Sequence, residues 1–330
     1  MQHTRLGRTG LNVSRICLGT MTFGLQVDEP GSRAILDHAR DLGVTFIDTA
    51  DVYPLGGDLT TVGRTEEILG RWWQGRRDEF VLATKCFGPT GSQPWDAGNS
   101  RRHIMDAIDA SLRRLQTDFI DLYQVHFDDR NTPLDETLGA LDDLVRVGKV
   151  RYIGCSNFLA YRLARAIGRS EVRGIARFDC VQPRYNLLFR EFERELFPLC
   201  VDEQIGVIPY NPIAGGMLSG KHDRTKPPEE GTRFTLGNAA RIYQDRYWHE
   251  NVFDTVDGLV KLASDAGMPL PTLAVAWVLR QPAVTSPIVG ASRPEQLDAT
   301  VAAVDARLDD DLVARLDELT AEYRRGDAPR

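Results

Sequence analysis

Short apolar runs alternate along the chain with longer segments in which apolar residues recur every three or four positions. The helical period is clear in residues 100–116, where Ile104, Ile108, Leu112 and Leu115 fall on one face. Continuous apolar runs are typical of parallel strands covered on both faces. Eight repeats of strand and helix predict a single closed parallel barrel, a (β/α)8 TIM barrel spanning residues 1–330. The strand runs are RICLG (15–19), VTFID (44–48), FVLATK (80–85), FIDLYQVH (119–126), RYIGCSN (151–157), FDCVQ (178–182), GVIPY (206–210) and SPIVG (286–290).

Four segments depart from this alternation. HTRLGRTGLNVS (3–14) predicts a β-hairpin with Arg-Thr-Gly at its turn, placed to cap the bottom of the barrel. Residues 87–99 and 222–250 predict long active-site loops, because loops of this length in compact domains are usually functional. Residues 308–325 predict an amphipathic helix, followed by a frayed tail at 326–330. The loop aromatics suggest a lid over a site: Trp95, Tyr243, Tyr247 and Trp248.

An open doubly wound sheet is the alternative fold. It normally carries a GxGxxG phosphate-binding turn after its first strand, and no GxGxxG occurs in this chain. The one Gly-Lys pair, in LSGKHD, lacks the spacing of a Walker loop. The closed barrel is therefore the preferred prediction.

Composition and charge narrow the class of protein. With 42% hydrophobic and 26% charged residues in 330, the chain resembles ordinary globular proteins. A net charge of −7 argues against nucleic acid or an anionic membrane as a partner, because these need a basic face. No run approaches the ~18 apolar residues of a membrane span, and the first ten residues lack the apolar core of a signal peptide. We therefore expect a cytoplasmic protein.

The cysteines give no sign of a disulfide framework or a metal site. Five is an odd number, and their scattered positions lack the Cys-x-x-Cys or Cys/His spacing of structural zinc. We interpret them as reduced thiols in the core and expect no metal. They are Cys17, Cys86, Cys155, Cys180 and Cys200.

Titratable residues end three consecutive predicted strands. In a barrel of this kind chemistry takes place at the carboxyl ends of the strands. Asp48 ends the second strand with Tyr53 just beyond, Lys85 ends the third and His126 the fourth. Each alone has an ordinary structural interpretation, as a turn former, a loop aromatic, a solvated strand end or a hydrogen-bonded barrel histidine. Together they predict one catalytic group.

Eight short motifs link these residues to a known family. In order they are GTMTFG, DTADVY, LATK, LYQVH, GCSN, QPRYN, YNPIAGGMLSGK and GASRPEQL, and they cover nearly the whole chain. With them the sequence closely resembles the aldo-keto reductase superfamily, in particular the branch that includes voltage-gated potassium channel β-subunits and deoxysugar ketoreductases. The resemblance implies a (β/α)8 barrel and a catalytic tetrad of Asp48, Tyr53, Lys85 and His126.

The resemblance also implies a reaction. A hydride from reduced nicotinamide would attack the carbonyl carbon of an aldehyde or ketone, possibly sugar-like, while Tyr53 supplies the proton. Lys85 would lower the pKa of the Tyr53 phenol, Asp48 would keep Lys85 charged, and His126 would orient the carbonyl oxygen. The residues expected to contact substrate are Tyr53, Trp95, His126 and Phe127, with Met21, Phe23 and Tyr243 as further pocket walls.

The implied cofactor is NADPH, held by strand-end side chains and loops. Amides near the fifth and sixth strand ends would suit the carboxamide, Tyr210 would stack on the nicotinamide, and small residues would approach the pyrophosphate. Ser292 and Glu295 have the spacing of a capping box at a helix start, where Arg293 would help bind the 2′-phosphate. The expected cofactor residues are Gly19, Thr20, Met21, Asp48, Ser156, Asn157, Gln182, Tyr210, Asn211, Pro212, Ile213, Ala214, Gly215, Lys221, Arg233, Gly290, Ser292 and Gln296.

Two departures from the family pattern and two rival functions stay open. Relatives often hold adenine with Glu and Asn where this chain has Ala299 and Thr300, and commonly carry glycine where it has Pro54 and Leu55. One rival is a cofactor-loaded regulatory subunit that senses redox state with little turnover. The other is a Schiff-base aldolase with Lys85 as nucleophile. The oligomeric state is left open by the sequence.

Overall fold

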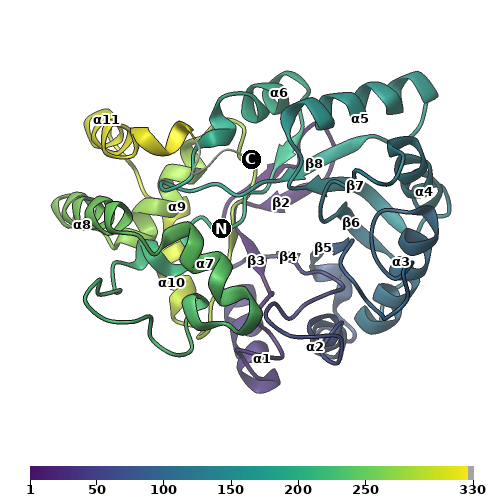
Figure 1. Cartoon of the computed structure of the whole chain (residues 1–330), viewed down its shortest axis with the longest axis horizontal. Coiled ribbons are helices and arrows are strands. Elements are labelled where there is room, and N and C mark those ends of the chain that lie inside the picture. Colours follow the sequence, from purple (N-terminus) through teal and green to yellow (C-terminus); the bar gives the residue numbers. More distant parts are fainter. Residues whose placement is uncertain (326–330) are drawn as a thin grey trace.

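Eight parallel strands curl into a barrel with helices on its outside (Figure 1). The computed structural model describes residues 1–325. The strand order is β10-β3-β4-β5-β6-β7-β8-β9, and parallel bridges from Val207 to Val284 and from Tyr210 to Ile288 join the two edge strands. The predicted closed barrel is confirmed. Its strands are β3 (Cys17–Gly19), β4 (Phe46–Asp48), β5 (Val81–Cys86), β6 (Ile120–Val125), β7 (Val150–Ser156), β8 (Phe178–Gln182), β9 (Gly206–Val207) and β10 (Ile288–Val289).

The helices form because apolar residues recur on one face. In α3, Ile104, Ile108 and Leu115 are fully buried, and the Ser100 hydroxyl accepts a hydrogen bond from the His103 amide at the helix start. The outer ring contains α1 (Glu29–Asp41), α2 (Arg64–Trp72), α3 (Arg101–Leu115), α4 (Leu134–Arg146), α5 (Ala160–Arg173), α6 (Leu196–Asp202), α9 (Leu270–Arg280) and α10 (Gln296–Val301). Three more helices are α7 (Ala240–Tyr247), α8 (Glu250–Asp265) and α11 (Asp310–Leu319), the last within the predicted C-terminal helix. The predicted tail at 326–330 lies outside the described residues.

The barrel interior is filled by one side chain from most strands. One buried cluster contains Cys17, Phe46, Ala83, Leu122, Cys180, Ile208 and Ile288. Since side chains alternate across a strand, the residue two positions further along each strand also faces inward, one layer closer to the carboxyl end. This layer is where the sequence places its polar residues.

The N-terminal hairpin closes the opposite end of the barrel. Strands β1 (His3–Arg5) and β2 (Asn12–Ser14) pair antiparallel, and Leu6 and Val13 join the interior cluster. Gly7 has a φ of 55°, and a Cβ there would lie 2.5 Å from the Gly206 nitrogen, so only glycine fits this approach. The predicted hairpin cap is confirmed.

The predicted loop at residues 222–250 is partly helical. It contains α7 and two short 3-10 turns, Arg233–Thr235 and Gly237–Ala239. Tyr243 and Tyr247, four positions apart, are buried on one face of α7. An eight-residue helix rich in polar residues has too short an apolar period to recognise in the sequence, so the loop prediction was wrong for this half. Residues 87–99 form turns with no helix or strand, as predicted.

Two further features bear on expectations from the sequence. All five cysteines are buried with free thiols. Within residues 1–325, no single helix is long and apolar enough to cross a membrane, and α8 and α9 reach that threshold only as a pair bent by 92°.

Candidate active site

A polar layer lies directly above the apolar interior, built from the inward-facing positions at the strand ends. Asp48 follows Phe46, Lys85 follows Ala83, and Gln182 follows Cys180, each by two residues. Strand register brings Asp48 level with Gly19 and Lys85 level with Gln124. The β-strand period therefore gathers carboxylate, ammonium and amide groups from several strands into one layer.

Lys85 is the centre of this layer and is fully buried. Its ammonium donates to Asp48 Oδ2 at 2.6 Å, to the Thr49 carbonyl at 2.7 Å and to the Tyr53 hydroxyl at 3.5 Å. An ammonium has three donors, so each has a partner. Asp48 Oδ1 in turn accepts from Gln182 at 2.8 Å and from Gln124 at 3.4 Å. The ion pair is thus held in one geometry by neighbours on both sides.

The electrostatics of the pair keep Lys85 charged. Burial opposes the charge, but Asp48 and Tyr53 outweigh it, and the pKa of Lys85 is raised above its ordinary value. The pKa of Tyr53 is also raised, because burial outweighs the opposing Lys85 cation. The expected lowering of the Tyr53 pKa is therefore wrong for this structure, in which burial of the phenol is the larger effect. The phenol stays protonated at neutral pH, and because its oxygen accepts from Lys85, its O–H is left to donate.

His126 stands beside Tyr53 at the end of β6. The two rings meet edge to face with centroids 5.9 Å apart, and the Phe127 ring stacks on the imidazole at 5.1 Å. Burial and the Lys85 cation hold the pKa of His126 well below its ordinary value, so the ring is neutral at pH 7. Within residues 1–325 neither ring nitrogen has a hydrogen-bond partner. A neutral imidazole in this position can donate one N–H to a bound oxygen.

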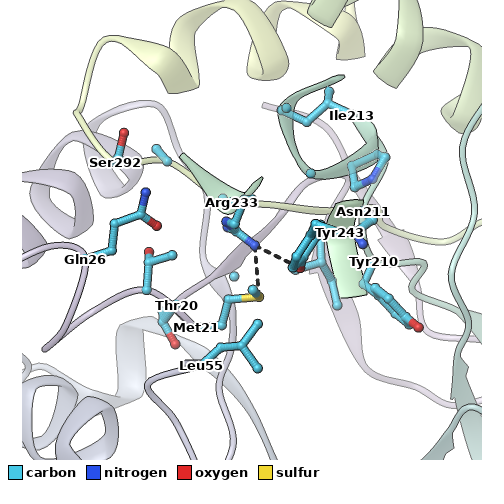
Figure 2. Close-up of a pocket in the computed structure, with 18 of the residues that line it drawn as sticks. Thr20, Met21, Gln26, Leu55, Tyr210, Asn211, Ile213, Arg233, Tyr243 and Ser292 are labelled. Carbon is cyan, nitrogen blue, oxygen red and sulfur yellow. Dashed lines mark hydrogen bonds between the residues drawn. The ribbon is translucent and has the colours of Figure 1, made fainter. Parts of the chain in front are cut away.

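These residues open into a cavity of about 580 Å³ that extends from Tyr53 to Ser292. Figure 2 shows Gln26, Thr20 and Ser292 on one side of it and Tyr210, Asn211 and Tyr243 on the other. The catalytic candidates Asp48, Tyr53 and His126 line it, while Lys85 lies beneath them. Of the expected cofactor and substrate residues, the following also line it: Gly19, Thr20, Met21, Phe127, Ser156, Asn157, Gln182, Tyr210, Asn211, Pro212, Ile213, Gly215, Lys221, Arg233, Gly290, Ser292 and Gln296.

Several predicted residues lie elsewhere. Trp95 does not line the cavity; it is 43% exposed, and the Arg102 guanidinium stacks on its ring. Phe23 is fully buried in the core, and Ala214 is buried with its amide bonded to the Asn211 carbonyl. Of the four aromatics expected to form a lid, only Tyr243 lines the cavity. An aromatic side chain in a loop packs wherever apolar surface is nearest, and the sequence does not specify that surface.

The amide groups near Tyr210 are already organised. Tyr210 donates its hydroxyl proton to Asn157 Oδ1 at 2.9 Å, and Asn157 Nδ2 donates to the His126 carbonyl at 3.0 Å. The Ser156 hydroxyl donates to the Gln182 carbonyl at 2.7 Å. Asn157 therefore ties the Tyr210 ring to the backbone of His126 and fixes the wall of the cavity between them.

Three cations line the cavity, and the part of the cavity that they line is called its basic end. Among residues 1–325 Arg233 contacts two neutral groups, Met21 Sδ at 3.2 Å and the Tyr243 hydroxyl at 3.3 Å, as the dashed lines in Figure 2 mark. Lys221 and Arg293 also line the cavity, and in the described part of the chain neither has an acidic partner. Gly290 leaves room for Arg233, since a Cβ there would lie 3.1 Å from a guanidinium nitrogen. Because these three cations have no acidic partner among the described residues, this end of the cavity is suited to an anion.

The expected capping box is wrong. Helix α10 begins at Gln296, and Glu295 makes no capping hydrogen bond. Instead Gln296 Oε1 accepts from the Ser292 amide at 2.8 Å and from its hydroxyl at 3.2 Å. Gln296, one position later, accepts the bond from the Ser292 amide that was expected of Glu295. Arg293 is exposed and lines the cavity.

The cavity walls carry unused polar atoms. Four buried polar atoms have no hydrogen-bond partner among the described residues: Thr22 Oγ1, Gln26 Oε1, Asn211 Nδ2 and His222 Nε2. Buried polar groups are normally paired, so these donors and acceptors imply a polar ligand. A dinucleotide fits this set, because it combines amide and hydroxyl groups with a pyrophosphate that the basic end can neutralise. Within residues 1–325, no cluster of three His, Cys, Asp or Glu side chains is arranged to hold a metal.

Sequence reasoning missed several residues of the site. Gln124 was predicted only as part of a strand, although its position two residues after Leu122 was sufficient to place it beside Asp48. Gln26 donates to the Gly231 carbonyl and joins two loops across the cavity. No local pattern identifies Gln26, His222 or Arg246, because loop packing alone brings them to the cavity.

Three of the four residues that depart from the family pattern line the cavity: Leu55, Ala299 and Thr300. Leu55 lies near Met21, whose carbonyl accepts from the Leu55 amide at 2.8 Å, and the Tyr53–Pro54 peptide bond is cis. At the other end the Thr300 hydroxyl donates to the Leu297 carbonyl at 3.1 Å. Ala299 and Thr300 therefore offer no carboxylate or free amide at this end.

Comparisons with known proteins agree with the fold. Residues 15–321 match the Aldo/keto reductase family. The chain is 41% identical over 327 residues to the uncharacterized oxidoreductase YrpG of Bacillus subtilis (97% of this chain, 96% of the relative). It is 36% identical over 312 residues to a probable voltage-gated potassium channel subunit beta of Arabidopsis thaliana (92% of each). It is 32% identical over 344 residues to versiconal hemiacetal acetate reductase of Aspergillus parasiticus (96% of each).

The fold and these matches define an oxidoreductase built on a parallel barrel. The chain belongs to the aldo/keto reductase family. Members of this family reduce carbonyl compounds and generally use NADH or NADPH, and the fold implies a small-molecule substrate.

Proposed function

We propose that this protein reduces an aldehyde or ketone to an alcohol with NADPH, and that Tyr53 donates the proton. The bound cofactor supplies the hydride. The side chains of this chain orient the carbonyl oxygen, deliver a proton to it and stabilise the charge left behind.

One observation carries the proposal: the Tyr53 hydroxyl lies at the end of the buried Lys85–Asp48 pair and faces the same cavity as a neutral His126. The phenol is protonated and its O–H is free to donate to a carbonyl oxygen. The phenolate that results would be stabilised by the Lys85 ammonium 3.5 Å away. His126 would hold the same oxygen with an N–H donor, so both groups act where negative charge develops.

The preference for NADPH over NADH rests on charge. Lys221, Arg233 and Arg293 line the cavity and have no acidic partners among residues 1–325. A site for NADH usually offers a carboxylate to the ribose hydroxyl groups, whereas a 2′-phosphate needs cations. The basic end therefore favours NADPH.

Two other functions are weighed against this one. A Schiff-base aldolase needs a neutral amine, but Asp48 holds the pKa of Lys85 above its ordinary value and keeps it charged. A regulatory subunit that binds cofactor without turnover has support from the Arabidopsis relative, a probable voltage-gated potassium channel subunit beta. An acid held at the end of a buried ion pair is unnecessary for binding alone, which favours the enzyme.

The test is steady-state oxidation of NADPH with a panel of aldehydes. Tyr53→Phe should lower kcat by about 100- to 10,000-fold, the usual contribution of a general acid, with little change in NADPH affinity. Tyr161→Phe is the control, because Tyr161 is 54% exposed on α5 and does not line the cavity. NADPH binding without oxidation by any carbonyl in the wild type would support the regulatory subunit. Equal turnover in Tyr53→Phe would reject Tyr53 as the proton donor.

The sugar-like substrate, the cytoplasmic location and the single domain remain predictions from the sequence.

A further inference from the structure

Helix α7 presents a positive charge to the cavity. Ile242, Tyr243 and Arg246 all line it, and their spacing of three and four residues places them on one face of the helix. On the same helix Arg241 points away: its side chain is 90% exposed and does not line the cavity. The cavity therefore receives one of the two arginines of α7.

Arg246 lies close enough to Tyr210 to act on it electrostatically. The adjacent Tyr243 acts electrostatically on Tyr53, and both Tyr243 and Arg246 act on Tyr210. Burial raises the pKa of the Tyr210 phenol, and the nearby Arg246 guanidinium opposes that rise. Figure 2 shows Tyr210 and Tyr243 on the side of the cavity opposite Gln26 and Ser292. Arg246 thus lies within electrostatic reach of Tyr210, the ring proposed to stack on the nicotinamide.

Arg246 has no partner within the chain. Among residues 1–325 it makes no hydrogen bond, ion pair or ring contact, although its side chain is only partly exposed. Two other arginines of residues 222–250 are paired: Arg241 with Asp245, and Arg224 with Glu250, Asp254 and Asp257. A guanidinium held partly out of water favours an anion that can accept two parallel hydrogen bonds.

The cofactor does not account for this charge. The anionic groups of NADPH are its phosphates, and Lys221, Arg233 and Arg293 are the cations of the proposed phosphate end. Near the nicotinamide position the molecule is neutral or positive. The anion that faces Arg246 must therefore come from the other ligand of the cavity.

The remaining walls near Tyr53 describe the rest of that ligand. They are apolar or aromatic: Met21, Val52, Leu55, Phe87, Phe127 and Ile242. A ligand that satisfies both Arg246 and these walls has an apolar body with an anionic group separated from its carbonyl.

We propose that Arg246 selects carbonyl substrates that carry an anionic group, a carboxylate or a phosphate. The proposal rests on the proposed carbonyl reduction and names the substrate class for that same site. The guanidinium binds the anion while the carbonyl oxygen lies against Tyr53 and His126.

The test compares two aldehydes of nearly the same shape, 4-formylbenzoate and its methyl ester, with NADPH saturating. Wild type should prefer the carboxylate. Arg246→Gln should lower kcat/KM for the carboxylate about 10- to 100-fold, the range for a lost charge-assisted hydrogen bond, mainly through KM, and leave the ester unchanged. Arg246→Lys should retain part of the preference. Arg241→Gln is the matched control, because it removes the same charge from the exposed face of α7 and should change neither substrate.

A second pair, glyceraldehyde 3-phosphate and glyceraldehyde, distinguishes phosphate from carboxylate. A preference for either anionic substrate that disappears in Arg246→Gln supports the proposal. Equal losses on charged and neutral substrates, or a parallel loss of NADPH affinity by fluorescence titration, would overturn it and make Arg246 a structural or cofactor residue.

Failure of the proposed function gives a different result. In that case the wild type reduces neither member of either pair, and direct binding decides the role of Arg246. Saturation-transfer NMR of 4-formylbenzoate on the NADPH complex should then show binding by wild type and its loss in Arg246→Gln. No difference between the two proteins would reject the anion site.

Discussion

Replacing Lys85 by methionine tests whether the buried ion pair maintains both the barrel and the chemistry. The side chain is fully buried, with its ammonium 2.6 Å from Asp48 and 2.7 Å from the Thr49 carbonyl. Methionine has similar length but no charge, so Asp48 would keep only its bonds from Gln182 and Gln124. Removing one partner of a buried pair costs about 3–5 kcal/mol, because the remaining charge has no counter-ion. We expect the free energy of unfolding of Lys85→Met to fall by about this amount.

The double variant Asp48→Asn/Lys85→Met separates charge from packing. Asparagine accepts the hydrogen bond from Gln182 without carrying a charge, so the double variant should recover about half or more of the lost stability. Neither variant should turn over normally, because in both the Tyr53 phenolate lacks its cation. Urea unfolding followed by circular dichroism measures the first effect, and NADPH oxidation with an aldehyde measures the second.

The reasoning would be refuted by a Lys85→Met protein within about 1 kcal/mol of wild type. It would also be refuted by a double variant no more stable than the single one, since the cost would then come from packing. Wild-type turnover in Lys85→Met would show that the ammonium has no part in the reaction.

Two further predictions concern other charged residues. Burial, together with the neighbouring Glu66 carboxylate, raises the pKa of Asp51 well above its ordinary value. Above about pH 4 the carboxyl group of Asp51 is therefore still protonated in the folded protein but ionised in the unfolded chain. The contribution of Asp51 to the free energy of unfolding therefore falls as pH rises. Asp51→Asn should raise Tm at pH 7–8 but not near pH 4. The same gain in Tm at both pH values would contradict this. Arg293→Gln should weaken NADPH about 10-fold or more and leave NADH unchanged, as measured by fluorescence titration. Equal weakening of both cofactors would remove Arg293 from the 2′-phosphate site.

Much of the fold could be predicted because its signals are local. The barrel strands are short apolar runs, and the period of two within each run also places Asp48, Lys85 and Gln182 in one inward-facing layer. The same argument applied to β6 would have added Gln124. These positions need only strand geometry and a closed barrel.

The loop residues could not be predicted in the same way. Trp95 and Tyr243 are both aromatic residues in segments predicted as loops, yet only Tyr243 reaches the cavity, because α7 carries it there while Arg102 holds Trp95 at the surface. Arg246 likewise has no sequence signal, since an arginine on a short polar helix is usually solvated. Packing between distant segments decided these placements.

The sequence by itself determined the eight-stranded barrel, its hairpin cap and the polar layer at the carboxyl ends of its strands, because each depends on the alternation of side chains along a strand. Only the tertiary structure decided which loop residues line the cavity and whether the pKa of Tyr53 rises or falls. These properties depend on how completely segments far apart in the chain bury one another, and burial is a sum over neighbours that no local pattern contains.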